Sequence, residues 1–155
     1  MTEPVNLVWF KRDLRVIDHR PLAAAATRGH VLPLYIAEPQ LWAQPDASAR
    51  QWEFAAECLH ELHEDLCALG QPLCVMVGEA LAALEKIRQT QGIAALWSHE
   101  ETGNGWTYQR DLAVKSWARQ HGIPWYEMRQ TGVQRRMASR NGWAKAWDAD
   151  MAQPI

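Results

Sequence analysis

Polar side chains follow the apolar segments of this chain directly, at positions where they could bind the polar edge of a ligand. They are Lys11, Arg12 and Asp13 after the first apolar segment, Glu38 after the second, and Glu101 and Asn104 after the fourth. Together they offer both charges and both hydrogen-bond donors and acceptors. Arg12 and Asp13 could orient a planar ligand, or they could form an internal salt bridge that fixes the turn.

Several common reaction centres are missing from the sequence. No Walker A motif occurs, and no GxGxxG follows the first apolar segment, which disfavours NAD. No GxSxG nucleophile elbow occurs either. His60 and His63 are three residues apart on one predicted helix but lack the HExxH pattern, which favours a solvated surface. The sequence therefore predicts neither catalytic residues nor a metal site.

Five apolar strands alternate with helices, and these elements must position the polar residues. The strands are expected at Val5–Phe10, Val31–Ala37, Leu73–Val77, Ile93–Trp97 and Ile123–Met128. Apolar strands separated by helices predict a doubly wound, Rossmann-like α/β sandwich of three layers. Its five-stranded parallel sheet is expected to have the order 3-2-1-4-5. In such a sheet, ligands bind beyond the carboxyl ends where the strand order reverses, here between the first and fourth strands.

Polar residues predict where the helices begin. Asp18 is expected to cap the first helix, and Ser48 with Gln51 forms a capping-box pattern for the second. The buried face of this second helix is expected to comprise Trp52, Ala55, Leu59, Leu62, Leu66 and Leu69. The third and fourth helices are expected over Ala80–Gln91 and from about Trp106 to His121, and Gly103–Gly105 is read as a turn.

Composition bounds the class of protein. The chain has 155 residues, of which 48% are hydrophobic, and a net charge of -2, so nothing biases it toward nucleic acid. The start of the chain lacks a signal sequence, and no apolar run is long enough to cross a membrane, so a cytoplasmic location is expected. The three cysteines are expected to be core thiols; they are Cys58, Cys67 and Cys74.

The last part of the chain differs from the rest. Residues 1–130 are expected to form one α/β domain, and 131–155 a connector to something further along. The connector mixes basic and aromatic residues, namely Arg135, Arg136, Arg140, Trp143 and Trp147. This mixture is interpreted as an interdomain contact rather than a DNA contact.

The segment Leu7–Leu22, LVWFKRDLRVIDHRPL, resembles the opening motif of the photolyase/cryptochrome family. The matching positions are Trp9, Phe10, Arg12, Asp13, Leu14, Arg15, Asp18 and Leu22, while His19 replaces the usual asparagine. Three further segments are similar to family blocks: Val31–Pro39, Ser48–Arg50 and Arg110–Asp111.

This resemblance implies an antenna domain that binds a light-harvesting pigment: a deazaflavin, another flavin or a folate. By family position, Arg12, Ile36, Glu38 and Arg50 would contact the pigment, and Thr102 and Asn104 stand where acids usually lie. FAD would sit in a separate helical C-terminal domain, through which alone damaged DNA would be bound. This chain is therefore expected not to repair DNA by itself. Two alternatives stay open: a free-standing nucleotide-binding module, and a scaffold domain without pigment.

Overall fold

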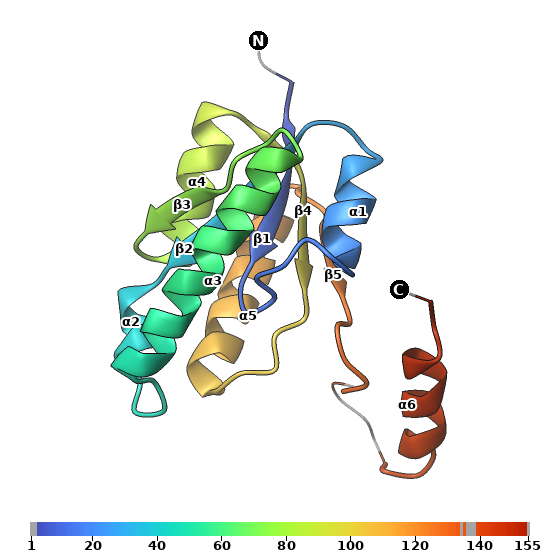
Figure 1. Ribbon diagram of the computed structural model, residues 1–155. Helices are drawn as coiled ribbons and strands as arrows, with labels where there is room; N and C mark the ends of the chain where they lie inside the picture. The colour runs from blue at the N-terminus through green and yellow to red at the C-terminus, as the bar shows by residue number, and fades with distance from the viewer. Residues whose placement is uncertain (1–2, 134, 136–138, 155) are drawn as a thin grey trace.

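A five-stranded parallel sheet forms the centre of the fold in this computed structural model, which describes residues 3–133, 135 and 139–154 (Figure 1). The strands are β1 (Val5–Phe10), β2 (Val31–Ala37), β3 (Cys74–Val77), β4 (Ile93–His99) and β5 (Trp125–Met128). Their order, β3-β2-β1-β4-β5, confirms the predicted one. Because all neighbouring pairs are parallel, the carboxyl ends of the strands meet at one edge of the sheet.

Helices cover both faces of the sheet. They are α1 (Arg20–Ala26), α2 (Pro39–Trp42), α3 (Ala49–Ala68), α4 (Ala80–Thr90), α5 (Gly105–Gln120) and α6 (Trp143–Met151). Figure 1 shows α3 in front of the sheet and α4 and α5 behind it. Leu7 and Trp9 of β1 pack against α4 and α5, and the alternate residues Val8 and Phe10 pack on the side of α1 and α3. This confirms the three-layer α/β sandwich.

The first helix begins one residue later than expected. His19, rather than Asp18, is the N-cap of α1, and its Nδ1 accepts a hydrogen bond from the backbone N–H of Leu22 at 3.1 Å. Asp18 instead adopts a left-handed conformation with φ 50°, which Asp tolerates better than most residues. The prediction for α3 was right: the Ser48 side chain accepts from the N–H of Gln51.

The buried face of α3 is shorter than predicted. Leu59, Leu62 and Leu66 are buried, but Trp52 and Leu69 are exposed. A 20-residue helix is about 30 Å long, whereas a seven-residue strand such as β2 spans about 23 Å. The ends of α3 therefore extend past the sheet that it covers.

The cysteines are more accessible than the sequence predicted. Cys67 is exposed, so the expectation of a core thiol was wrong there, and Cys58 is only half-buried. Cys74 is also half-buried, but it packs against the core as expected. Cys67 follows Leu66 directly on α3, and this step turns it away from the buried stripe of the helix.

Two helices lie in segments for which no helix bounds were predicted from the sequence. The short α2 occupies the loop after β2, and α6 lies in the connector. The ring of Trp147 packs so closely on Gly132 that a Cβ at that position would clash with it. Arg129 pairs with Asp150 at 2.8 Å and so also joins α6 to the domain. Arg136 of the predicted basic group lies outside the described residues.

Within the part of the chain that the structure describes, none of the helices combines the length and the apolar character that crossing a membrane requires.

Candidate functional site

A cavity of about 670 Å³ opens at the carboxyl edge of the sheet. This volume falls within the range of about 300–1,000 Å³ that is typical of small-molecule sites. Its polar lining includes Lys11, Arg12, Arg15, Glu38, Asp46, Gln51, Glu101, Asn104 and Arg110. Its apolar lining includes Trp9, Phe10, Leu14, Tyr35, Ile36, Leu41, Trp42, Ala47, Phe54, Ala55 and Cys58. The ends of β1 and β2, with α2 and α3, thus provide most of its walls.

The cavity lies nearer to β2 and α3 than the strand order predicted. A much smaller hollow, about 140 Å³, lies where β1 and β4 end. Residues that line it form two ion pairs: Arg12 Nε lies 3.0 Å from Glu101 Oε1, and Lys11 Nζ lies 3.2 Å from Asp111 Oδ2. Arg12 and Glu101 line both spaces.

Six of the eight residues predicted to bind a cofactor line the main cavity: Lys11, Arg12, Ile36, Glu38, Glu101 and Asn104. Two lie elsewhere. Asp13 is buried behind the turn that follows β1, and Arg50 is exposed in the first turn of α3. Asn104 also caps α5, because its side chain accepts from the N–H of Thr107, which agrees with a turn at this place.

Arg110 of α5 lies at the centre of a buried group of ionised side chains. Its guanidinium donates to Glu38 Oε2 at 2.6 Å, to Asp111 Oδ1 at 3.0 Å, and to Glu101 Oε2. We call these four residues, with Lys11, the Arg110 cluster. Burial disfavours the charge on Arg110, but the neighbouring carboxylates outweigh it and raise its pKa. Sequence reasoning noted Arg110 only as part of a family motif and gave it no role in the site.

The ring of Trp9 also holds the cations of this cluster in place. Lys11 Nζ lies 4.6 Å from the ring centroid, and Arg110 Cζ lies 4.9 Å from it. Both distances allow cation–π attraction, which is stronger where water is excluded. Since Trp9 is fully buried, the cluster is fixed to the core of the sheet.

Glu38 has one carboxylate oxygen that the cluster does not use. Its side chain is 4% exposed, and Oε2 binds Arg110. Among the described residues, none donates a hydrogen bond to Oε1, which we call the open acceptor. Burial raises the pKa of Glu38 even though Arg110 opposes the shift. Because a buried acceptor without a donor is costly, this oxygen suits an N–H or O–H group of a ligand.

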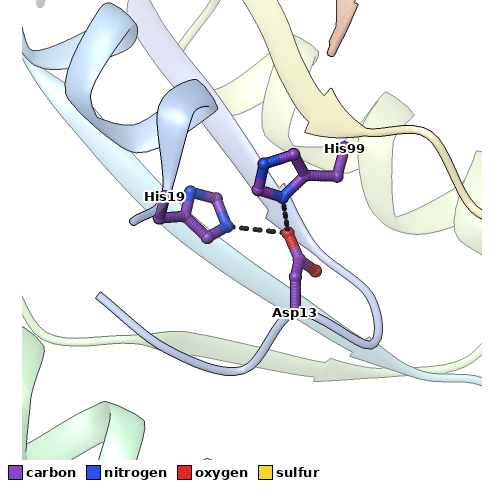
Figure 2. Close-up of side chains that lie close together, drawn as sticks. All are labelled: Asp13, His19 and His99. Atoms are coloured by element: carbon purple, nitrogen blue, oxygen red, sulfur yellow. Dashed lines mark hydrogen bonds and ion pairs between the residues drawn. The ribbon is translucent and has the colours of Figure 1, made fainter. Parts of the chain in front are cut away.

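A second buried group lies behind the cavity, where β1 and β4 meet the start of α1 (Figure 2). Asp13 Oδ2 lies 2.7 Å from His19 Nε2 and 2.7 Å from His99 Nδ1. Asp13 Oδ1 accepts from the backbone N–H of Lys11 at 2.8 Å. We call Asp13, His19 and His99 the Asp13 hub. Burial disfavours the Asp13 charge, but the bonds from His19 and His99 outweigh it and hold its pKa well below its ordinary range.

The Asp13 hub has the residue types of a metal site, but its hydrogen bonds favour another interpretation. The three potential ligand atoms lie within 4.8 Å of one another. However, His19 Nδ1 accepts from Leu22, so in a neutral imidazole Nε2 must carry the proton that it donates to Asp13. A protonated nitrogen cannot bind a metal. Sequence reasoning missed the hub because His99 is 86 residues from Asp13.

Comparisons with known proteins identify the family of this chain. The sequence model of the DNA photolyase family matches residues 6–138. The deoxyribodipyrimidine photo-lyase of Salmonella typhimurium is 39% identical over 88 residues, which cover 55% of this chain and 19% of that protein. A cryptochrome DASH of Solanum lycopersicum is 29% identical over 105 residues, 63% of this chain and 18% of that protein. The chain thus spans about a fifth of the length of these relatives.

Solved structures show the same fold. A bacterial class III photolyase from Agrobacterium tumefaciens superposes with a TM-score of 0.77 at 25% identity, over 92% of this chain and 29% of that one. An archaeal photolyase from Sulfolobus tokodaii gives 0.74 at 22% identity, over 96% of this chain and 35% of that one. The family match, the sequence relatives and the shared fold converge: this chain belongs to the DNA photolyase family and corresponds to the N-terminal α/β domain of photolyases and cryptochromes.

Proposed function

We propose that this chain is the antenna domain of a photolyase or cryptochrome, and that its cavity binds a planar heterocyclic pigment. A flavin, a deazaflavin or a folate has the required size and a polar ring edge. The observation that carries the proposal is a cavity of about 670 Å³ with mostly apolar walls, whose lining includes Glu38, a buried carboxylate with one oxygen that no described residue binds.

The apolar and the polar residues of the cavity lining suit the two parts of such a ligand. Phe10, Ile36 and Phe54 can pack against a ring system. The open acceptor can receive a ring N–H, since heterocycles of these classes carry amide-like N–H groups. Arg12 is exposed and can reach a carbonyl or phosphate oxygen of the ligand while it pairs with Glu101.

The rest of the proposal concerns protein beyond this domain. The Sulfolobus tokodaii photolyase, which shares the fold, was solved with two FAD molecules that implied a novel light-harvesting cofactor. By analogy, we propose that FAD and damaged DNA bind to a helical domain that follows residues 131–155. This chain alone is then expected not to split thymine dimers, and repair by the purified chain would contradict this division of labour.

Titration of the purified chain with FMN, a deazaflavin and a folate tests the proposal. We expect one of them to bind with quenching or a shift of its fluorescence. Glu38→Ala and Arg12→Ala should each weaken binding about tenfold or more, because each removes a hydrogen bond that involves a charged group. Arg119→Ala is the matched control, since Arg119 is exposed near the end of α5 and does not line the cavity.

Other outcomes favour the alternatives. Tight binding of ATP or AMP, with none of the pigments, would favour a nucleotide-binding module. Binding of no ligand at all would favour a scaffold domain. Equal affinity in wild type, Glu38→Ala and Arg12→Ala would contradict the placement of the ligand in this cavity.

A further inference from the structure

We propose that the Asp13 hub is a positioning device for the cavity: it fixes the spacing of the two loops that carry Arg12 and Glu101. The inference rests on the proposed function for its effect on a ligand, but the positioning itself can be measured without one.

Two contacts connect the same pair of loops. Asp13 follows Arg12 directly, and His99, the last residue of β4, precedes Glu101 by two positions. On the buried side, His99 Nδ1 donates to Asp13 Oδ2 at 2.7 Å. On the cavity side, Arg12 Nε donates to Glu101 Oε1 at 3.0 Å. The buried contact therefore sets the separation at which the cavity-side pair can form.

Asp13 also fixes the shape of its own loop. Its Oδ1 accepts from the N–H of Lys11, and its backbone carbonyl accepts from the N–H of Arg15, both at 2.8 Å. This turn determines where the Lys11 side chain leaves the backbone, and Lys11 then reaches Asp111 of the Arg110 cluster. One carboxylate thus positions both basic residues at the end of β1.

His19 joins the start of α1 to the same carboxylate. Its Nδ1 accepts from Leu22 and so caps the helix, while its Nε2 donates to Asp13. Asp13, His19 and His99 are all at least 96% buried, where hydrogen bonds are stronger and lost partners cost more than in water. Both oxygens of Asp13 already accept hydrogen bonds, so the carboxylate acts by holding loops and not by contacting a ligand.

Three substitutions separate positioning from stability. His99→Ala removes the donor to Asp13. His99→Asn places an amide N–H near the position of Nδ1 and should restore it. Asn6→Ala is the matched control: Asn6 is buried at the other end of the sheet and accepts from Trp97 Nε1 at 3.1 Å. It should lower stability without reaching the cavity.

The readouts are the dissociation constant for FMN, or for whichever pigment binds, and amide hydrogen exchange at residues 11–15 and 100–101. We expect His99→Ala to weaken binding about tenfold, as loss of one hydrogen bond to a charged group predicts, and to speed exchange in both loops. His99→Asn should recover most of both, and Asn6→Ala should change neither. Unchanged exchange and affinity in a folded His99→Ala protein would overturn the proposal.

Two further measurements cover the remaining outcomes. If His99→Ala does not fold, His19→Asn serves instead. Asparagine keeps a cap for α1 but is too short to reach Asp13. His19→Asn must then speed exchange in residues 11–15, or the proposal fails.

If the wild type binds no pigment, the proposed function fails, while the exchange data still decide the role of the hub. Nitrogen-15 NMR should show protons on His19 Nε2 and on His99 Nδ1, the two nitrogens that face Asp13. Displacement of these protons by stoichiometric Zn²⁺ would identify a metal site and overturn the assignment.

Discussion

Two buried groups of charged side chains lie at the same edge of the sheet, and they differ in how completely they are paired. In the Asp13 hub, one carboxylate receives all its hydrogen bonds from within the fold. In the Arg110 cluster, Arg110 pairs with three carboxylates, Lys11 pairs with one of them, and the open acceptor of Glu38 remains. The first group can hold structure, and the second can also receive a ligand.

The difference has an electrostatic signature. The pKa of Asp13 is lowered, so its ionised form stabilises the fold, whereas the pKa of Glu38 is raised, so its ionised form is the costly one. The two groups should therefore contribute pH dependence of opposite sign to the free energy of unfolding.

The largest expected effect on the free energy of unfolding comes from removing Arg110 from the Arg110 cluster. Arg110→Leu leaves the carboxylates of Glu38, Glu101 and Asp111 buried beside one another, and we expect the free energy of unfolding to fall by about 3–5 kcal/mol. Urea unfolding at neutral pH measures it. Arg110→Lys should lose less, because it keeps the charge but not the forked geometry.

A surface ion pair provides the contrast for this prediction. Arg88 pairs with Glu85 on α4 at 2.7 Å, and both side chains are about one-third exposed. Arg88→Leu should cost far less than Arg110→Leu, because exposed pairs contribute little. Similar losses of unfolding free energy in Arg88→Leu and Arg110→Leu would show that the Arg110 cluster is as solvated as the surface pair.

The next largest effect on stability is expected in the Asp13 hub. Asp13→Asn cannot accept from Lys11, His19 and His99 together, and we expect a loss of about 2 kcal/mol at neutral pH. Because the folded pKa of Asp13 lies below its ordinary value of 3.8, its stabilisation is present above that value and is lost as the pH falls through it and below. The variant should therefore lose less stability on acidification than the wild type.

Unfolding curves at a series of acidic pH values measure this slope. Asn6→Ala is again the control, since it destabilises the sheet without removing an ionisable group and should keep the wild-type slope. A wild-type slope in Asp13→Asn would mean that Asp13 does not carry the acid sensitivity.

The sequence predicted the sheet because its strands are short apolar runs between clear helix signals. Val5–Phe10 and Val31–Ala37 are too short and too apolar to be surface helices, so they were predicted as buried strands. The right-handed crossover rule then leaves few possible strand orders. The placement of polar residues beyond the strand ends was equally predictable, because parallel strands bring those ends together. That reasoning found Arg12 and Glu38.

The sequence could not show which distant residues the side chains in the loops contact. The family positions of the acids hold Thr102 and Asn104, yet the loop after β4 turns the neighbouring Glu101 onto Arg12 and Arg110. His19 was noted as a replacement for asparagine, but nothing nearby indicated that His99 would share its partner. Contacts between segments so far apart depend on the packed geometry of the strand ends, which no local pattern encodes.

A smaller effect, of opposite sign, is expected at Glu38. Its folded pKa lies above the ordinary value of 4.5, so between the two values the folded state holds the proton more tightly and stability falls as the pH rises. Glu38→Gln removes this slope. We expect the unliganded variant at neutral pH to equal the wild type or exceed it by about 1 kcal/mol, because a buried charge is gone.

The same substitution should weaken pigment binding, since the one amide oxygen of glutamine is used by Arg110. Unfolding curves from mildly acidic to neutral pH, with a pigment titration beside them, measure both changes. If Glu38→Gln lost stability and kept its affinity for the pigment, Glu38 would stabilise the fold and would not bind the ligand.

The last effect appears only at alkaline pH and shows how far the Arg110 cluster extends. Burial, and then the charge of Glu38, raise the pKa of Tyr35 from its ordinary value of 10.0 to about 12. Between these values the folded state keeps the phenolic proton and the unfolded state loses it, so stability falls as the pH rises, by on the order of 1 kcal/mol per unit. Tyr35→Phe should abolish this loss. In the wild type, tyrosinate absorbance should report a high titration midpoint for Tyr35. Glu38→Gln should lower this midpoint, and Asp13→Asn should leave it unchanged. A midpoint that responded to Asp13→Asn rather than to Glu38→Gln would mean that the two buried groups are electrostatically coupled, because the charge removed from the Asp13 hub would then affect Tyr35 in the cavity wall.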